Sequence, residues 1–164
     1  MKFLILLISL FLVYSLSGFS QDNTFTFKGQ VHFRAKPLKG ATIEVYVGGD
    51  LNYETISKGS GKFQFDLKSE EQYMVEVSME NMRLKTIWIN TKRTKDLDVK
   101  VPVFSFDIHL EVEEITPYDE LSEIPVTYIK YLSKKEVFYM DKTYAQVIKR
   151  KKKEIKENSF LVRR

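Results

Sequence analysis

The most chemically distinctive stretch of the sequence is a run of basic residues near its C-terminus. Such a run attracts anions, and the classes that fit are anionic lipid head groups, an acidic polysaccharide and nucleic acid. The stretch lacks the interleaved aromatic residues of a single-stranded nucleic-acid binder. The alternative is a solvated helix face, because Glu154 and Glu157 follow basic residues at i,i+4 spacing. The residues of this basic cluster are Lys149, Arg150, Lys151, Lys152 and Lys153.

Trp88 is a second candidate binding residue. It alternates with Ile87 and Ile89, so it is expected on the opposite face of the same strand. An exposed tryptophan at this place is a platform on which a sugar ring can stack, whereas a covered one packs beneath the C-terminal segment. We favour the covered position.

His32 and His109 are the only histidines, and both fall on the polar faces of expected strands. Asp107 and Glu111 share the face of His109 and offer oxygen ligands for a metal. Residues two apart on a strand are separated by roughly 6.6 to 7 Å, which is too far for tight chelation. The sequence therefore predicts a solvated strand face, with no metal site and no cofactor.

Residue patterns typical of hydrolases are missing. The sequence has no cysteine and no Gly-x-Ser-x-Gly motif, and Ser60 lies between glycines in an expected turn. The adjacent pair Glu70 and Glu71 would point to opposite faces of a strand, so the two carboxylates would not flank one cleft. The sequence therefore predicts no catalytic residues and a chain that is not an enzyme.

Alternation of apolar and polar residues predicts the elements that position these side chains. Strands are expected from about residue 24 to residue 112, including one through Leu97, Val99 and Val101, with turns between them. This pattern predicts a mainly β fold, a seven- or eight-stranded antiparallel sandwich. Gly29 is expected at a bulge or a close backbone contact, and Gly59-Ser60-Gly61 at a hairpin. The expected core comprises Phe27, Val31, Ile43, Val45, Phe63, Phe65, Tyr73, Val75, Ile108 and Leu110.

The last third of the chain is expected to add a strand pair and a helix. The strands are predicted at residues 125–132 and 136–139, and the helix from Lys142 to about Glu157 with Asp141 as its N-cap. The strand pair and helix are expected to pack against the sandwich or against a partner. The apolar side of the helix is predicted to carry Tyr144, Val147, Ile148 and Ile155, with the stem of Lys151 covering the gap.

Four short motifs in the first part of the chain carry a family resemblance. They are Gly29-Gln30-Val31, Pro37-Leu38-Lys39-Gly40-Ala41-Thr42-Ile43, Gly61-Lys62-Phe63-Gln64-Phe65 and Tyr73-Met74-Val75-Glu76-Val77-Ser78. In this order and spacing they resemble the carboxypeptidase-regulatory-like domain. The resemblance implies a transthyretin-like (prealbumin-like) sandwich and a noncatalytic accessory module. The aspartate-rich turn of that family is replaced here by Lys58-Gly59-Ser60.

The N-terminus has the layout of a secretory signal peptide. Lys2 is followed by an apolar run from Phe3 to Leu16 and by small residues before Gln21. The alternative is an uncleaved anchor extending through Phe19. A signal ending in Phe-Ser-Gln is similar to those of Bacteroidetes-type bacteria. Without cysteine, the chain has neither a lipid-modified cysteine nor disulfides. The expected division is a signal peptide at residues 1–20, the sandwich at 21–114, and an acidic connector, strand pair and basic helix at 115–164.

These features together predict an exported accessory module. We expect a noncatalytic structural or protein–protein adaptor in the periplasm, at the outer membrane or outside the cell. The expected partner is another envelope protein, and nucleic acid is not expected. The alternative is a surface protein that binds an anionic lipid or glycan through the basic C-terminal helix, with Trp88 as a possible sugar platform. The sequence leaves the oligomeric state open.

We expect the N-terminal segment to be removed between Ser20 and Gln21 during export, because the charged, apolar and small-residue regions follow in the order that signal peptidases require. Intact-mass measurement of the protein from an envelope fraction checks this expectation. A mature chain that still carries Phe3–Leu16 would contradict it.

Overall fold

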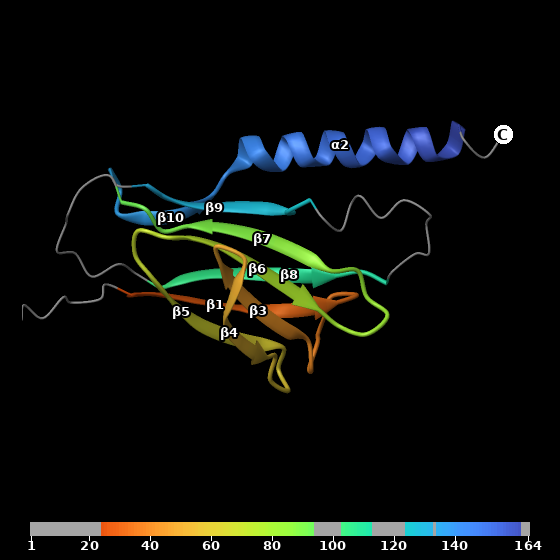
Figure 1. Ribbon diagram of the computed structural model, residues 1–164. Helices are drawn as coiled ribbons and strands as arrows, with labels where there is room; N and C mark the ends of the chain where they lie inside the picture. Colours follow the sequence, from red (N-terminus) through yellow and green to blue (C-terminus); the bar gives the residue numbers. More distant parts are fainter. Residues whose placement is uncertain (1–23, 94–102, 113–123, 133, 162–164) are drawn as a thin grey trace, which may run out of the picture.

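The computed structural model describes residues 24–93, 103–112, 124–132 and 134–161, which form two packed β-sheets and one helix (Figure 1). The predicted signal peptide, the strand predicted through Leu97, Val99 and Val101, and the acidic connector that begins at Thr116 lie outside these residues. Within the described ranges, no helix has both the length and the apolar character that crossing a membrane requires.

The smaller sheet is built around strand β1 (Thr24–Phe33). β1 pairs antiparallel with β5 (Lys62–Lys68) and with the short β2 (Lys36–Pro37). It pairs in parallel with β8 (Phe104–Leu110), which comes from a distant part of the chain. Side chains of β5 alternate strictly between buried and exposed, as expected for a strand with one face on the core.

The larger sheet has six strands in the order β10-β9-β7-β6-β3-β4. All neighbours pair antiparallel except β7 and β9, which are parallel. Helix α2 follows β10 and lies along the β9 side of the sheet (Figure 1). The bounds are β3 (Thr42–Val47), β4 (Asp50–Ile56), β6 (Gln72–Ser78), β7 (Lys85–Asn90), β9 (Thr127–Leu132), β10 (Val137–Met140) and α2 (Lys142–Leu161).

The predicted mainly β sandwich with a C-terminal strand pair and helix is confirmed. The prediction of an antiparallel arrangement needs two corrections, because β1–β8 and β7–β9 are parallel. Alternation along one strand predicts which face is buried, but it carries no information about the direction of the neighbouring strand. The direction depends on connections between residues far apart in the sequence.

All ten residues predicted for the core are buried, and the last third of the chain contributes to the same core. The ring of Phe27 is fully buried and lies 5.8 Å from that of Phe65 and 4.9 Å from that of Phe138 on β10. Ile129 on β9 is also fully buried. The strand pair therefore extends the larger sheet edge to edge and does not form a separate layer over the sandwich.

The turn at Gly59-Ser60-Gly61 is not the hairpin that the sequence predicts. The turn is hydrogen-bonded, with the amide of Gly61 donating to the carbonyl of Lys58 at 2.7 Å, and Gly61 has a positive φ of 72°. Beyond it the strands separate, because β4 pairs with β3 in the larger sheet whereas β5 pairs with β1 in the smaller one. The glycines therefore turn the chain from one sheet to the other.

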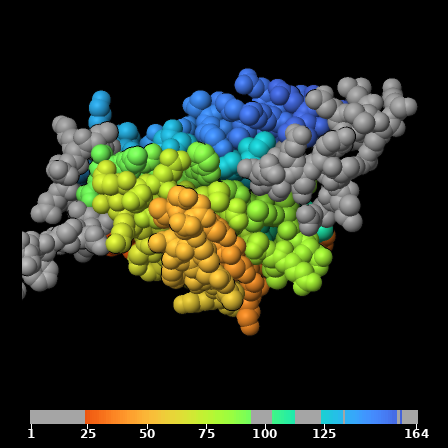
Figure 2. Space-filling view, in the orientation of Figure 1, coloured from red at the N-terminus to blue at the C-terminus, as the bar shows by residue number. Residues whose placement is uncertain are grey.

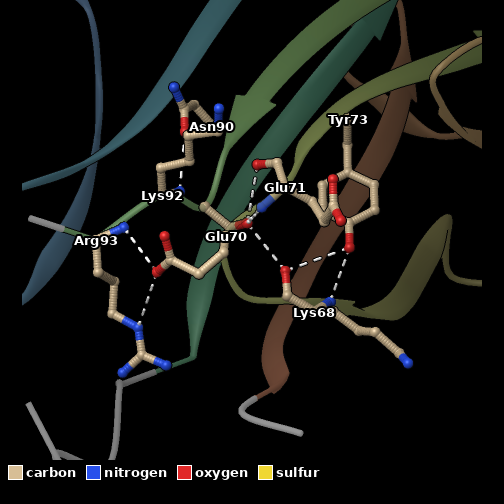
Figure 3. A network of polar contacts seen from close by, with 8 residues as sticks. Lys68, Glu70, Glu71, Tyr73, Asn90, Lys92 and Arg93 are labelled. Carbon is tan, nitrogen blue, oxygen red and sulfur yellow. Dashed lines mark hydrogen bonds and ion pairs between the residues drawn. The ribbon is translucent and has the colours of Figure 1, made fainter. Parts of the chain in front are cut away.

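A buried hydroxyl joins the two sheets at the turn between β5 and β6, beside Lys68, Glu71 and Tyr73, which are labelled in Figure 3. Thr91, which follows β7, is fully buried and accepts a hydrogen bond from the backbone N–H of Glu71 at 3.0 Å. It donates to the carbonyl of Lys68, at the end of β5, over 2.9 Å. The hydroxyl of Tyr73 on β6 also accepts a bond from the amide of Lys68 at 3.0 Å. These bonds hold β5 of the smaller sheet against β6 and β7 of the larger one.

Gly29 lies where the backbones of β1 and β8 approach closely. A Cβ atom at this position would overlap the backbone carbonyl of Phe106 and would lie 2.7 Å from the ring of Phe63. Of the two alternatives expected at Gly29, a bulge or a close backbone contact, the structure shows the close contact, and it is with β8.

We predict that Gly29→Ala lowers the free energy of unfolding by more than about 2 kcal/mol, because the added methyl group forces β1 and β8 apart. Urea unfolding measures the effect. Gly59→Ala is the matched control, because a Cβ there meets no atom within 4 Å, and its stability should stay within about 1 kcal/mol of the parent protein. Equal stability of the two variants would contradict the assigned contact.

Candidate functional site

The basic cluster lies on α2, along the top of the molecule in the view of Figure 2. The side chains of Lys149, Arg150, Lys151 and Lys153 are exposed to solvent. Within the described part of the chain, one of these four residues forms an ion pair: Lys153 with Glu157 at 3.6 Å. Both partners of that pair are well exposed, so it adds little to stability. The exposed part of the cluster is therefore available to an anionic surface or ligand.

Lys152 differs from the rest of the basic cluster because its side chain points toward the sandwich. It is half-buried, and burial lowers the pKa of its ammonium group, as does the nearby charge of Lys85. The helix side that packs on the sandwich thus carries Tyr144, Ile148, Lys152 and Ile155. The predicted covering role of Lys151 is wrong, since Lys151 and Val147 are exposed. The i,i+4 spacing from Ile148 places Lys152 on the packed side.

The start of α2 is fixed by Asp141, as predicted. Its carboxylate accepts hydrogen bonds from the amides of Thr143 and Tyr144 at 3.0 and 3.2 Å. The ammonium of Lys130 on β9 donates to the same carboxylate at 2.6 Å. The bond from Lys130 is the largest cause that lowers the pKa of Asp141, and the two amides lower it further. The hydroxyl of Tyr144 donates to the carbonyl of Pro125 at 2.9 Å, which ties the first turn to the approach to β9.

Trp88 lies on the outer face of the larger sheet, opposite Ile87 and Ile89 as predicted. It is 38% exposed, and its ring meets that of Tyr128 on β9 edge-on at 6.1 Å. The C-terminal segment therefore borders Trp88 without covering it, and the covered position that the sequence analysis favoured is wrong. The register of the sheet places an apolar row across five strands, made of Leu51, Tyr46, Met74, Trp88 and Tyr128.

A row of glutamates runs beside this apolar row on the same outer face. Glu54 on β4 lies opposite Glu44 on β3, and Glu44 lies opposite Glu76 on β6. Like charges directly opposite on a sheet repel each other. Burial raises the pKa of Glu76, and the charge of Glu44 raises it further. The ion pairs found among the described residues include none of these glutamates, so the row is an uncompensated acidic stripe there.

β4 forms an open edge of the larger sheet. In the described parts of the chain, no strand pairs with its outer side, and every residue from Asp50 to Ile56 is exposed except Thr55. Leu51, Tyr53 and Ile56 expose 52%, 41% and 58% of their surface. Lysine or proline often blocks such edges, yet β4 contains neither, whereas β5 begins and ends with lysine.

The two histidines lie together, although they are far apart in the sequence. His32 on β1 is the parallel partner of His109 on β8, and their rings stack with centroids 5.1 Å apart. Asp107 lies near them, with an oxygen 3.7 Å from Nε2 of His32. Sequence reasoning missed this cluster, because it compared each histidine with neighbours on its own strand only. Among the residues that the structure describes, no group of three or more potential ligands is placed to hold a metal ion.

Comparisons with known proteins find similarity in the fold alone. No family model matches the chain, and no curated protein matches it. Catechol 1,2-dioxygenase of Acinetobacter radioresistens is a similar solved structure, with 14% identity, a TM-score of 0.45, and coverage of 60% of this chain and 55% of the enzyme. The mercury-inhibited catechol 1,2-dioxygenase of Acinetobacter sp. ADP1 matches at 12% identity and a TM-score of 0.43, covering 58% and 55%. The TIE protein of Bacillus anthracis matches at 11% identity and a TM-score of 0.43, covering 54% of this chain and 17% of that protein.

These matches contradict the prediction that the chain is not an enzyme, because catechol 1,2-dioxygenases are among the solved structures similar to its sandwich. The chain spans little more than half the length of those enzymes, and at these TM-scores the likeness carries no argument for a particular activity. The prediction relied on the absence of local catalytic motifs. The pairing of His32 with His109 illustrates the error, because a fold brings together side chains that no local motif connects.

We predict that acid weakens the attachment of α2. Folding lowers the pKa of the Asp141 carboxyl from its unfolded value of about 3.8. A carboxylate of this kind stabilises the folded protein at a pH above the unfolded pKa. The stabilisation is lost as the pH falls through the folded pKa. The helical circular-dichroism signal should therefore fall in acid, and Asp141→Ala should show a reduced signal already at neutral pH. Glu157→Gln is the control, since its ion pair is exposed. An acid response that is identical in the parent protein and Asp141→Ala would contradict the role of Asp141.

Proposed function

We propose that the protein is an adaptor of the cell envelope that binds an extended segment of another protein along β4. The main observation in support is the open edge of β4, which exposes Leu51, Tyr53 and Ile56 and contains neither lysine nor proline. An exposed edge strand offers a row of free backbone donors and acceptors, and a partner strand can add to the sheet there. The signal-like N-terminus and the resemblance to the carboxypeptidase-regulatory-like domain support an accessory role in an exported protein.

The backbone geometry indicates which groups of β4 are free to pair with an added strand. The amide of Ser57 donates to the carbonyl of Ala41, on the β3 side, at 2.8 Å. Backbone groups alternate in direction along a strand, so the amides of Ile56 and Glu54 point away from β3. These amides are the donors that an added strand would use.

The acidic stripe favours a partner segment of basic character. Glu54 lies on β4 itself, and Glu44 and Glu76 continue the row on the next strands. An added strand that carries lysine or arginine opposite Glu54 would relieve the repulsion within this row. We therefore propose a partner segment that is extended, carries basic residues and places apolar side chains against Leu51 or Ile56.

A second function is favoured by the exposure of the basic cluster on α2. Lys149, Arg150, Lys151 and Lys153 face solvent on a helix whose first turn is tied to the sheet through Asp141. This arrangement suits attraction to anionic lipid or glycan. Retention through these charges would weaken sharply as ionic strength rises, whereas strand addition depends mainly on backbone hydrogen bonds and apolar contacts.

The adaptor proposal predicts that Glu54→Pro prevents partner binding while Glu54→Ala preserves most of it. Proline removes the outward amide of residue 54, and alanine keeps that amide while removing the carboxylate. Immobilised parent protein and both variants are exposed to envelope extract, and retained proteins are quantified by mass spectrometry. Thermal unfolding verifies that both variants are folded. A protein retained equally by all three chains would contradict strand addition at β4, and a protein lost equally from both variants would indicate recognition of the carboxylate only.

A further inference from the structure

His32 and His109 form a pair on the outer face of the smaller sheet. The parallel register of β1 and β8 puts them side by side, whereas their sequence neighbours Val31 and Ile108 are buried on the inner face. The two rings stack with centroids 5.1 Å apart and planes inclined by 21°. The sequence contains no other histidine and no cysteine, so all of its imidazole groups meet at this place. Imidazole is a preferred ligand of zinc, copper and nickel ions.

Asp107 brings a carboxylate to His32 in a fixed orientation. One of its oxygens accepts a hydrogen bond from the backbone amide of Gln30 at 3.1 Å, and the other lies 3.7 Å from Nε2 of His32. Gln30 is the register partner of Asp107 on β1, so the strand pairing itself holds the carboxylate beside the imidazole. Carboxylates that bind metal ions are commonly oriented by such a second hydrogen bond.

Nε2 of His32 is buried and has no hydrogen-bond partner among the described residues. A buried polar atom without a partner is costly, and the oxygen of Asp107 at 3.7 Å is too distant for a hydrogen bond. A nitrogen and an oxygen bound to one zinc ion in tetrahedral geometry are separated by roughly 3.4 Å, since each lies about 2.0 to 2.2 Å from the metal. The gap between His32 and Asp107 is therefore close to the size that a shared ion needs.

His109 supplies a third donor only after its ring turns. As the structure stands, the described residues contain no three-ligand group placed to hold a metal ion, because the ring of His109 is stacked on that of His32. The side chain of His109 is exposed, and exposed side chains change rotamer rapidly. A turn about its side-chain bonds moves a ring nitrogen toward the gap beside His32. Water can fill the fourth position of such a site.

We propose that His32, Asp107 and His109 bind a divalent transition-metal ion such as Zn²⁺. His32 and Asp107 are the preplaced ligands, and His109 closes on the ion. The ion gives Nε2 of His32 the partner it lacks and joins β1 to β8 at the centre of the smaller sheet. Two imidazole nitrogens favour such an ion over Mg²⁺, which prefers oxygen ligands. The site lies on the other sheet from β4, so it does not depend on the adaptor proposal.

The proposal is tested with Zn²⁺ alone as the probe and the full chain, made without a histidine tag, as the protein. Isothermal titration measures stoichiometry and affinity, and NMR of the histidine ring nitrogens identifies the ligands. One Zn²⁺ should bind per chain, shift the ring nitrogens of both histidines, and bind at least about tenfold more tightly than Mg²⁺. Absence of binding, or equal affinity for Zn²⁺ and Mg²⁺, would overturn the proposal. Binding that leaves both rings unshifted would show an adventitious ion only and would overturn it as well.

Variants separate this site from general attraction of Zn²⁺ to carboxylates. His32→Gln, His109→Gln and Asp107→Asn should each weaken Zn²⁺ binding about tenfold or more, because each removes one ligand. Glu54→Gln, in the acidic stripe of the larger sheet, is the matched control and should keep the parent affinity. Thermal unfolding checks that the variants are folded, and His109→Gln, at an exposed position, still tests the site if His32→Gln fails that check. Unchanged affinity in His109→Gln, or an equal loss in Glu54→Gln, would overturn the proposal.

Discussion

The backbones of β1 and β8 approach so closely at Gly29 that any side chain there would meet the carbonyl of Phe106. This contact joins the first described strand to one about 80 residues later and makes β1 the centre of the smaller sheet. The parallel register places Phe27 beside Phe104 and Val31 beside Ile108, so the apolar sides of both strands face the core together. On the opposite face the same register stacks His32 on His109. Both the core and the polar cluster thus depend on one position without a side chain.

The C-terminal segment completes the larger sheet and also positions the charged residues. β9 adds to β7 in parallel, and Phe138 on β10 places its ring against Phe25 and Phe27 in the common core. Asp141 then caps α2 and binds Lys130, so the helix starts at a defined place beside the sheet. The basic helix is therefore attached to the sandwich through packed and hydrogen-bonded residues at its beginning.

Charge is distributed over separate parts of the molecule. The outer face of the larger sheet carries the acidic stripe of Glu54, Glu44 and Glu76 near the open edge at β4. The basic cluster lies near the opposite edge of that sheet, along β9. There α2 presents four basic residues to solvent, and Lys152 points toward Lys85. The two regions are separated by the width of the sheet, so they do not neutralise each other through direct ion pairs.

The sequence by itself determined the described strands except the short β2, together with the N-cap at Asp141 and the ten core residues, because alternation and capping are local properties. At Gly29 it left a bulge and a close backbone contact as alternatives, and it did not indicate which strand would supply the contact. Only the tertiary structure decided that β1 pairs with β8, that β4 and β5 part into different sheets, and that β9 joins β7. Those pairings set the acidic stripe and the histidine pair, since each unites residues from different strands. The physical reason is that the pairing of strands depends on burying the apolar surface of all strands together. A short stretch of sequence does not contain that information.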